Sequence, residues 1–204
     1  MEYKRINLDY KSLEPYIDDR TLDLHYNAHY RNYTDKLNKY LKNINYNYGL
    51  SGEELAQNIN ILPMDNRDEI LFNLGGYLNH NLYFYNLTGK KKDIPLPLLE
   101  LINKYFGSFS LFKEEFIDMA MEVKGSGYTF LVLDKNNKLR IINTSNQDTP
   151  YYYGFIPIMT IDVWEHSYYL KYTYERKKYL DNIFNIIDFK KVYMLYLESI
   201  KPNT

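Results

Sequence analysis

The stretch that indicates most about this chain is Asp162-Val163-Trp164-Glu165-His166-Ser167-Tyr168-Tyr169. It follows an apolar run, 156–163, that is typical of a buried strand, so it lies where a strand runs out into a helix or an irregular turn. Asp162 and His166 are four residues apart and can converge there on one ion. A carboxylate together with an imidazole suits a first-row transition metal with mixed oxygen and nitrogen ligands, such as manganese or iron.

Composition narrows the class of protein. The 204 residues suffice for one sizeable core, or for two small lobes that share one. A formal net charge of −1 gives no basic stripe for nucleic acid and no polybasic signal for a membrane surface. There is no Cys, so any metal must be held by His, Asp or Glu, and no apolar run approaches the ~18 residues of a membrane span. We expect a cytoplasmic protein with neither nucleic-acid nor membrane partners.

The first half of the chain has the pattern of two long helices. Residues 21–48 predict one helix, with Asp18 or Asp19 as its cap, and residues 68–87 predict the second. A short helix over 53–62, ended by Pro63, lies between them. One face of the first helix is predicted to carry Leu22, His25, His29, Tyr33 and Leu37. The natural arrangement is an antiparallel helix hairpin that forms a domain over 1–88.

The second half mixes helices with strands. A linker over 89–97 is followed by predicted helices at 98–105 and 111–123. Strands are expected at 128–133, 139–143 and 156–163, and the tail 177–200 is mostly helical, with Asp188 as a cap. The fold class is therefore α+β: an N-terminal long antiparallel helix hairpin, then a C-terminal lobe, 89–204, of helices with a three-stranded antiparallel sheet. We expect the metal site between the two domains.

Four candidate ligands come from distant segments: His25, His80, Asp162 and His166. Each alone has an ordinary explanation, because a single His on an apolar helix face is more often a core residue and an Asp after a strand is more often a cap. Together, three imidazoles and one carboxylate leave a position open for solvent or substrate, which a closed structural site does not need. Magnesium and calcium would require mainly oxygen ligands.

Together these segments resemble the iron/manganese superoxide dismutase family. The stretch 162–169 matches the signature of that family at every position. Residues 25–33, His-Tyr-Asn-Ala-His-Tyr-Arg-Asn-Tyr, are similar to its first-helix motif, and residues 75–80, Gly-Gly-Tyr-Leu-Asn-His, are similar to its second-helix motif. Segments 125–127 and 146–150 match two further parts of the family. The resemblance covers essentially the whole chain.

The resemblance implies a role for each residue of the site. The metal ligands would be His25, His80, Asp162 and His166. Tyr33 would stand at the mouth of the substrate funnel, and Trp164 would form one wall of the pocket. Gln147 would donate to metal-bound solvent and, with Tyr33, relay protons.

The resemblance also implies a homodimer, and the sequence leaves a tetramer open. Glu165 would bond across the interface to the partner subunit's His166. His29 would lie behind Tyr33 and reach towards the partner subunit's Tyr169. Each metal site would then depend on dimerisation.

The implied reaction is the disproportionation of superoxide to dioxygen and hydrogen peroxide by redox cycling of one manganese or iron ion per subunit. Manganese-type members take the solvent-bonding Gln from the position of Gln147, which favours manganese. Thr160 and Ile161 look more iron-like. We therefore expect manganese with activity in iron also, a cambialistic enzyme.

The sequence departs from the family in its aromatic residues. Tyr128 and Phe84 stand where the family usually has Trp, and Tyr30 replaces a frequent second His. The alternative function is a non-catalytic structural or interaction protein of the same fold. The presence of the full ligand set argues against it, because a buried polar cluster without a ligand is costly. A carboxylate-bridged di-iron bundle would need paired Glu-x-x-His motifs, which the sequence lacks.

Overall fold

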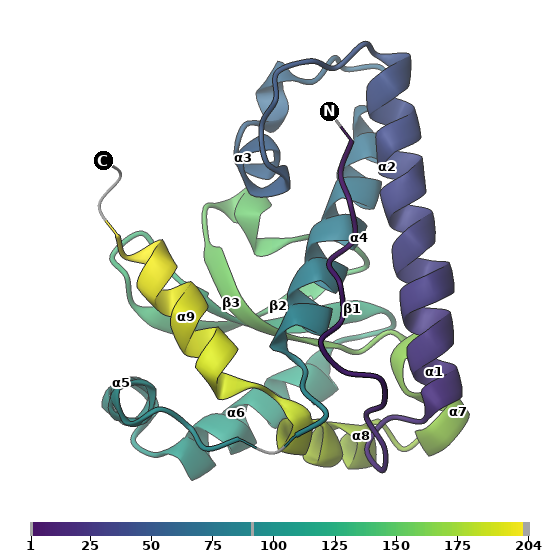
Figure 1. Cartoon of the computed structure of the whole chain (residues 1–204). Helices are drawn as coiled ribbons and strands as arrows, with labels where there is room; N and C mark the ends of the chain where they lie inside the picture. The colour runs from purple at the N-terminus through teal and green to yellow at the C-terminus, as the bar shows by residue number, and fades with distance from the viewer. Residues whose placement is uncertain (1, 91, 202–204) are drawn as a thin grey trace.

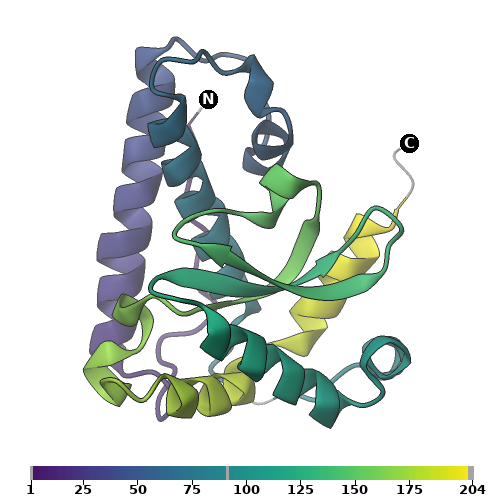
Figure 2. The same ribbon diagram turned by 180° about the vertical axis from the view of Figure 1, so that it is seen from behind.

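The computed structural model describes residues 2–90 and 92–201, and their elements follow the predicted order (Figure 1). The N-terminal part contains α1 (Asp19–Leu24), the π-helical turn η1 (His25–Tyr30), α2 (Arg31–Asn43), α3 (Gly52–Gln57), the 3₁₀ turn η2 (Ile59–Ile61) and α4 (Arg67–Asn86). Helices α2 and α4 lie side by side and run in opposite directions (Figures 1 and 2). The predicted antiparallel hairpin is confirmed.

The first long helix differs from its prediction at its C-terminal end. Its N-terminus is capped by Asp18, whose carboxylate accepts a hydrogen bond from Thr21 N at 2.8 Å. It ends at Asn43 rather than Tyr48, because Asn45 adopts a left-handed conformation with φ of 52°. Asn reaches that region more readily than most residues, so a helix stop is natural there.

The same helix also contains a π-helical turn, which the sequence pattern does not predict. The six residues of η1 begin at His25. Each residue turns an α-helix by about 100°, so a wider turn changes which later side chains share a face with His25. His25, Tyr33 and Leu37 are buried, whereas His29 is only half-buried.

The C-terminal part combines helices with one sheet. Its elements are α5 (Leu96–Phe106), α6 (Phe109–Glu122), β1 (Gly127–Leu133), β2 (Leu139–Ser145), η3 (Pro150–Tyr153), β3 (Ile156–Asp162), η4 (Glu165–Ser167), α7 (Tyr169–Tyr172), α8 (Arg176–Ile183), η5 (Phe184–Ile186) and α9 (Phe189–Ser199). Asp188 caps α9 as predicted, because its side chain accepts from Lys190 N and Lys191 N. The α+β fold class is confirmed.

The sheet positions the end of β3 against the helical hairpin. Its strand order is β2-β1-β3, with both pairs antiparallel (Figure 2). Every residue of the central strand β1 is buried. Helices α4 and α9 pack against β3, while α6 packs against β1 and β2. Asp162 at the end of β3 is paired with Tyr128 in β1. Within the described residues, no helix is both long enough and apolar enough to cross a membrane.

Candidate metal centre

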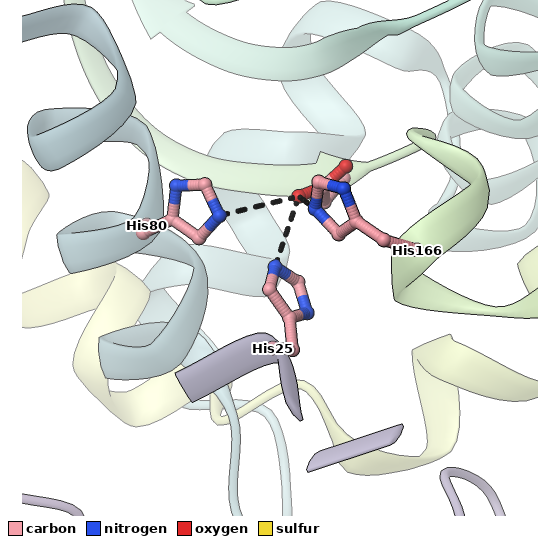
Figure 3. A group of neighbouring side chains, drawn as sticks. His25, His80 and His166 are labelled. Atoms are coloured by element: carbon pink, nitrogen blue, oxygen red, sulfur yellow. Dashed lines mark ion pairs between the residues drawn. The ribbon is translucent and has the colours of Figure 1, made fainter. Parts of the chain in front are cut away.

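The fold brings all four predicted ligands to one point. His25 begins η1, His80 lies in α4, Asp162 ends β3 and His166 lies in η4. One donor atom from each lies within 4.8 Å of the others. The three imidazoles point at the same carboxylate: His25 Nε2, His166 Nε2 and His80 Nε2 lie 3.1, 3.4 and 4.0 Å from Asp162 Oδ2 (Figure 3).

These four atoms are buried and lack hydrogen-bond partners. His25, His80 and Asp162 are almost inaccessible to solvent, and the His166 side chain is 13% exposed. None of the three Nε2 atoms, nor Asp162 Oδ2, makes a hydrogen bond of acceptable geometry, although they lie close together. Buried polar atoms without partners are rare and costly. An ion among them would satisfy all four at once.

In two of the ligands, the polar atom that does not face the cluster makes a hydrogen bond to the backbone. The atom that faces the cluster is left free to bind an ion. His80 Nδ1 donates to Gly76 O at 2.6 Å, so its Nε2 is the unprotonated nitrogen. Asp162 Oδ1 accepts from Trp164 N at 2.8 Å, so Oδ2 faces the imidazoles. A donor set of three nitrogens and one oxygen fits manganese or iron.

The protonation states also suit a metal. Burial lowers the pKa of His25 to about 4 and takes the pKa of His80 well below its usual range. Burial would raise the pKa of Asp162, but His166 and His25 outweigh it, so that pKa lies far below the ordinary value. At neutral pH His25 and His80 are therefore neutral and Asp162 is charged. These donors need lose no proton before an ion binds.

A hydrogen-bonded chain runs beside the cluster. Gln147 Nε2 donates to the Tyr33 hydroxyl at 3.1 Å, and the Tyr128 hydroxyl donates to Gln147 Oε1 at 3.0 Å. Asn79 Nδ2 donates to the backbone oxygen of Gln147 at 3.3 Å. The Tyr33 ring centroid lies 5.2 Å from that of His80. Tyr33 and Gln147 are thus adjacent to the four converging side chains.

Comparison with known proteins gives the same assignment. Residues 2–88 match the family described as iron/manganese superoxide dismutases, alpha-hairpin domain, and residues 95–194 match the C-terminal domain of the same family. The chain is 40% identical over 188 residues to "Superoxide dismutase [Mn]" of Thermus aquaticus, an alignment that covers 92% of each protein. The chain belongs to the iron/manganese superoxide dismutase family. It is also 41% identical over 180 residues to "Superoxide dismutase [Mn]" of Thermus thermophilus, with 88% of each covered.

Family membership makes this chain a superoxide dismutase enzyme with an iron or manganese site. Of the other residues that the family resemblance assigns, Trp164 lies over His166, with ring centroids 5.5 Å apart, and its Nε1 donates to Asn146 O at 3.0 Å. The His29 ring stacks on the His166 ring, with ring centroids 4.1 Å apart. Glu165 and Tyr169 are exposed.

Two of the three aromatic departures from the family, Tyr30 and Phe84, pack together beside the ligands, whereas Tyr128 lies in a separate buried cluster. Tyr30 is fully buried, and its ring lies nearly parallel to His80 at 5.6 Å and to Phe84 at 5.7 Å. Its hydroxyl donates to Asn81 and accepts from Ile6 N. Tyr30 thus supports a ligand ring in this superoxide dismutase. This role of Tyr30 was not predicted from the sequence, although its position next to His29 was a signal.

The helix α4 approaches the network so closely that only glycine fits. A Cβ on Gly75 would lie 1.8 Å from Gln147 O, and a Cβ on Gly76 would lie 2.6 Å from the Tyr33 ring. In this dismutase, therefore, the hydrogen-bonding amide near Tyr33 comes from Gln147, and residues 75 and 76 of α4 have no room for a side chain.

Proposed function

We propose that this chain disproportionates superoxide to dioxygen and hydrogen peroxide with a single ion per subunit held by His25, His80, Asp162 and His166. The observation that carries the proposal is the convergence of four buried donor atoms that have no other partner. When bound, a manganese or iron ion supplies the one-electron exchange by which one superoxide is oxidised and a second is reduced. The chain itself must bind the anion and deliver two protons to the reduced product.

Tyr33 is the residue that we propose delivers protons. Burial raises the pKa of Tyr33, so its phenol stays protonated at neutral pH. Its oxygen accepts from Gln147 Nε2, which leaves its own proton free for an anion or for water. With 9% of its surface exposed, Tyr33 is the network member that reaches solvent, because Gln147 and Tyr128 are buried. Trp164 and His29, whose rings both stack on His166, would shape the pocket.

Manganese is the metal that we propose this site favours, with activity in iron also. Manganese-type members of the family take the amide that bonds the metal-bound solvent from the position of Gln147. Gly75 and Gly76 leave no room for the amide that iron-type members supply from this helix. Thr160 and Ile161, which look iron-like, argue for a mixed preference. Activity per bound ion, measured on separately manganese-loaded and iron-loaded protein, tests the preference. Activity with iron alone would contradict it.

A homodimer, or a tetramer built from it, is the proposed assembly. Glu165 is exposed in a single chain, and the neighbouring His166 side chain is 13% exposed. A metal-bound His ordinarily donates from its other ring nitrogen to a carboxylate or carbonyl. Glu165 of a second subunit would supply that acceptor, with His29 and Tyr169 at the same interface.

The division into domains 1–88 and 89–204, with the site between them, is also a proposal. His25 and His80 come from the first part, and Asp162 and His166 come from the second. A cytoplasmic location is proposed on composition alone.

Replacing His80 with Ala tests the ligand assignment. We expect the variant to lose both its bound metal and superoxide consumption, because one of four donors is gone and Asp162 keeps an unpaired buried charge. His29→Ala is the matched control: it removes an imidazole beside the site that is not a proposed ligand, and should retain metal. An active, metal-free His80→Ala variant would overturn the assignment. A wild-type protein that binds metal without consuming superoxide would favour the non-catalytic alternative.

A further inference from the structure

The N-terminal segment runs along the helical hairpin and is bonded to it (Figure 1). Tyr3 N donates to Asn38 Oδ1 at 2.8 Å, and Asn38 Nδ2 donates back to Tyr3 O at 2.9 Å. The next residues, Arg5 and Ile6, contact the π-helical turn η1. No step of the proposed reaction uses this segment, so its contacts with η1 call for a separate explanation.

Arg5 binds η1 at the residue that follows the ligand His25. Its Nη1 donates to the backbone oxygen of Tyr26 at 2.7 Å and lies 3.3 Å from Asn27 Oδ1. Its guanidinium carbon lies 4.5 Å from the centre of the Tyr26 ring, which is a cation–π contact. A hydrogen bond from a charged donor is stronger than one between neutral groups. The half-buried Arg5 side chain therefore holds both the backbone and the ring of Tyr26.

Ile6 adds two hydrogen bonds to the same turn. The Tyr26 hydroxyl donates to Ile6 O at 2.6 Å, and Ile6 N donates to the Tyr30 hydroxyl at 3.2 Å. Tyr26 lies near the start of η1 and Tyr30 is its last residue. Residues 5 and 6 therefore hold the turn near both of its ends.

The two tyrosines that the N-terminal segment holds pack towards the metal ligands. The Tyr26 ring meets the Phe84 ring edge-on at 5.3 Å, and the Phe84 ring lies 4.9 Å from that of His25. The Tyr30 ring lies nearly parallel to that of His80 at 5.6 Å. A shift of η1 would therefore change the packing of two ligand rings.

The wide turn needs contacts from outside the helix. A π-helical turn is rare, and most helical residues form the regular α-helix instead. A carbonyl oxygen has two lone pairs, so Tyr26 O can accept from Arg5 in addition to any bond within its helix. Because each α-helical residue adds a rotation of about 100°, the form of this turn decides how His25 is rotated relative to Tyr33. We propose that Arg5 is a positioning residue, which holds the carbonyl of Tyr26 and thereby keeps η1 in the form that aims His25 at the metal.

The inference rests on the proposed ligand set, and its test does not need turnover. The full chain is loaded with cobalt(II), whose visible absorption bands depend on the number and arrangement of its ligands. In Arg5→Met, which removes the charge and the donors, we expect shifted bands and a Kd for cobalt raised about tenfold in competition with a chelator. Arg5→Lys should restore the wild-type bands. Both bonds of Arg5 come from one nitrogen, and an ammonium group can replace that nitrogen.

Two further variants separate positioning from general damage. Lys4→Met removes the same charge from an exposed neighbour and should change neither the bands nor the Kd. Tyr26→Phe removes the bond to Ile6 O but leaves Arg5 in place, so it should shift the bands in the same direction as Arg5→Met.

Wild-type bands and a wild-type Kd in Arg5→Met would overturn the inference, even if the variant unfolds more easily, because Arg5 would then only stabilise the fold. That result would leave the proposed ligand set intact. A wild-type protein that binds no cobalt would instead overturn the ligand set, and the inference with it.

Discussion

At Gly75 the helix α4 lies close against the backbone of Gln147. A Cβ there would lie 1.8 Å from Gln147 O, and backbone cannot move aside as a side-chain end can. We predict that Gly75→Ala displaces Gln147, lowers superoxide consumption strongly, and lowers the free energy of unfolding by roughly 1–3 kcal/mol or more. Denaturant unfolding and an activity assay measure both effects.

Gly52→Ala is the control for that change. Its Cβ would meet the end of the Leu78 side chain at 3.0 Å and the Tyr77 ring at 3.2 Å, both of which can shift. We expect activity close to wild type. Equal activity in the Gly75→Ala and Gly52→Ala variants would show that the approach to Gln147 is not a constraint.

Protonation of His25 makes stability depend on pH in the metal-free protein. Its pKa is lowered by burial from 6.5 to about 4, and that of His80 is lowered in the same direction. Between pH 6.5 and 4 the unfolded chain binds protons that the folded chain does not, so stability falls as pH falls through that interval. We predict that His25→Gln reduces the slope by up to about 1.4 kcal/mol per pH unit, measured by urea unfolding of chelator-treated protein. An unchanged slope would refute the burial of a neutral His25.

Residue-level expectations succeeded where the residue type itself carries the chemistry. Three imidazoles and a carboxylate in matching motifs were sufficient to name the cluster that the structure brings together. The contacts of Tyr30, Asn79 and Tyr128 could not be predicted. In a sequence, a Tyr or Asn that bonds to the site cannot be distinguished from one that is simply part of the core, because its partner is known only from the structure. The partner of each of these polar side chains lies in a distant segment of the chain.

The π-helical turn is the feature of a single element that matters most to the site. Deleting Asn27, an exposed residue within η1, would allow a regular α-helix and turn everything before it by about 100° relative to α2. We predict that the deletion variant stays helical by circular dichroism but loses metal, because His25 and Tyr33 no longer face the same point. Asn27→Ala, which loses the bond to Asp23 but keeps the length, should retain metal. A deletion variant with full metal content would show that the turn has no such role.

The hydrophobic pattern of the sequence predicted which segments are helices and which are strands, whereas the exact ends of these elements depended on single residues. The helices and strands were predicted from periodicity and turn residues, and the caps at Asp18 and Asp188 were recognisable. The early end of the first helix depends on the left-handed conformation of Asn45, and the same helix also contains the π-helical turn η1. Neither is visible in a pattern of apolar residues.

At the scale of the whole molecule, the exposed Glu165 beside the buried cluster predicts that assembly and metal binding are linked. We expect wild-type protein to sediment as a dimer or a tetramer. Glu165→Ala should shift it towards monomer and weaken metal retention, because His166 loses its outer hydrogen-bond acceptor. Glu114→Ala removes an exposed carboxylate from α6 and is the control. A wild-type protein that sediments as a monomer at micromolar concentration would contradict the proposed interface.

The overall arrangement was predictable to different degrees in its two halves. Two long helices joined by a connection with only a short helix in it favour an antiparallel hairpin on physical grounds, and the hairpin is observed. The meeting of β3 with that hairpin was not derivable from periodicity, since nothing local says where a strand lies against a helix. The position of β3 against the hairpin was expected only from the family resemblance. The prediction of the whole arrangement therefore depended strongly on one stretch, 162–169.

The most direct test of the account is a crystal structure of the purified, manganese-loaded protein with anomalous data collected on both sides of the manganese absorption edge. The account predicts one anomalous peak per subunit within bonding distance of His25 Nε2, His80 Nε2, His166 Nε2 and Asp162 Oδ2. A map in which these four atoms point apart, with no anomalous peak among them, would contradict it.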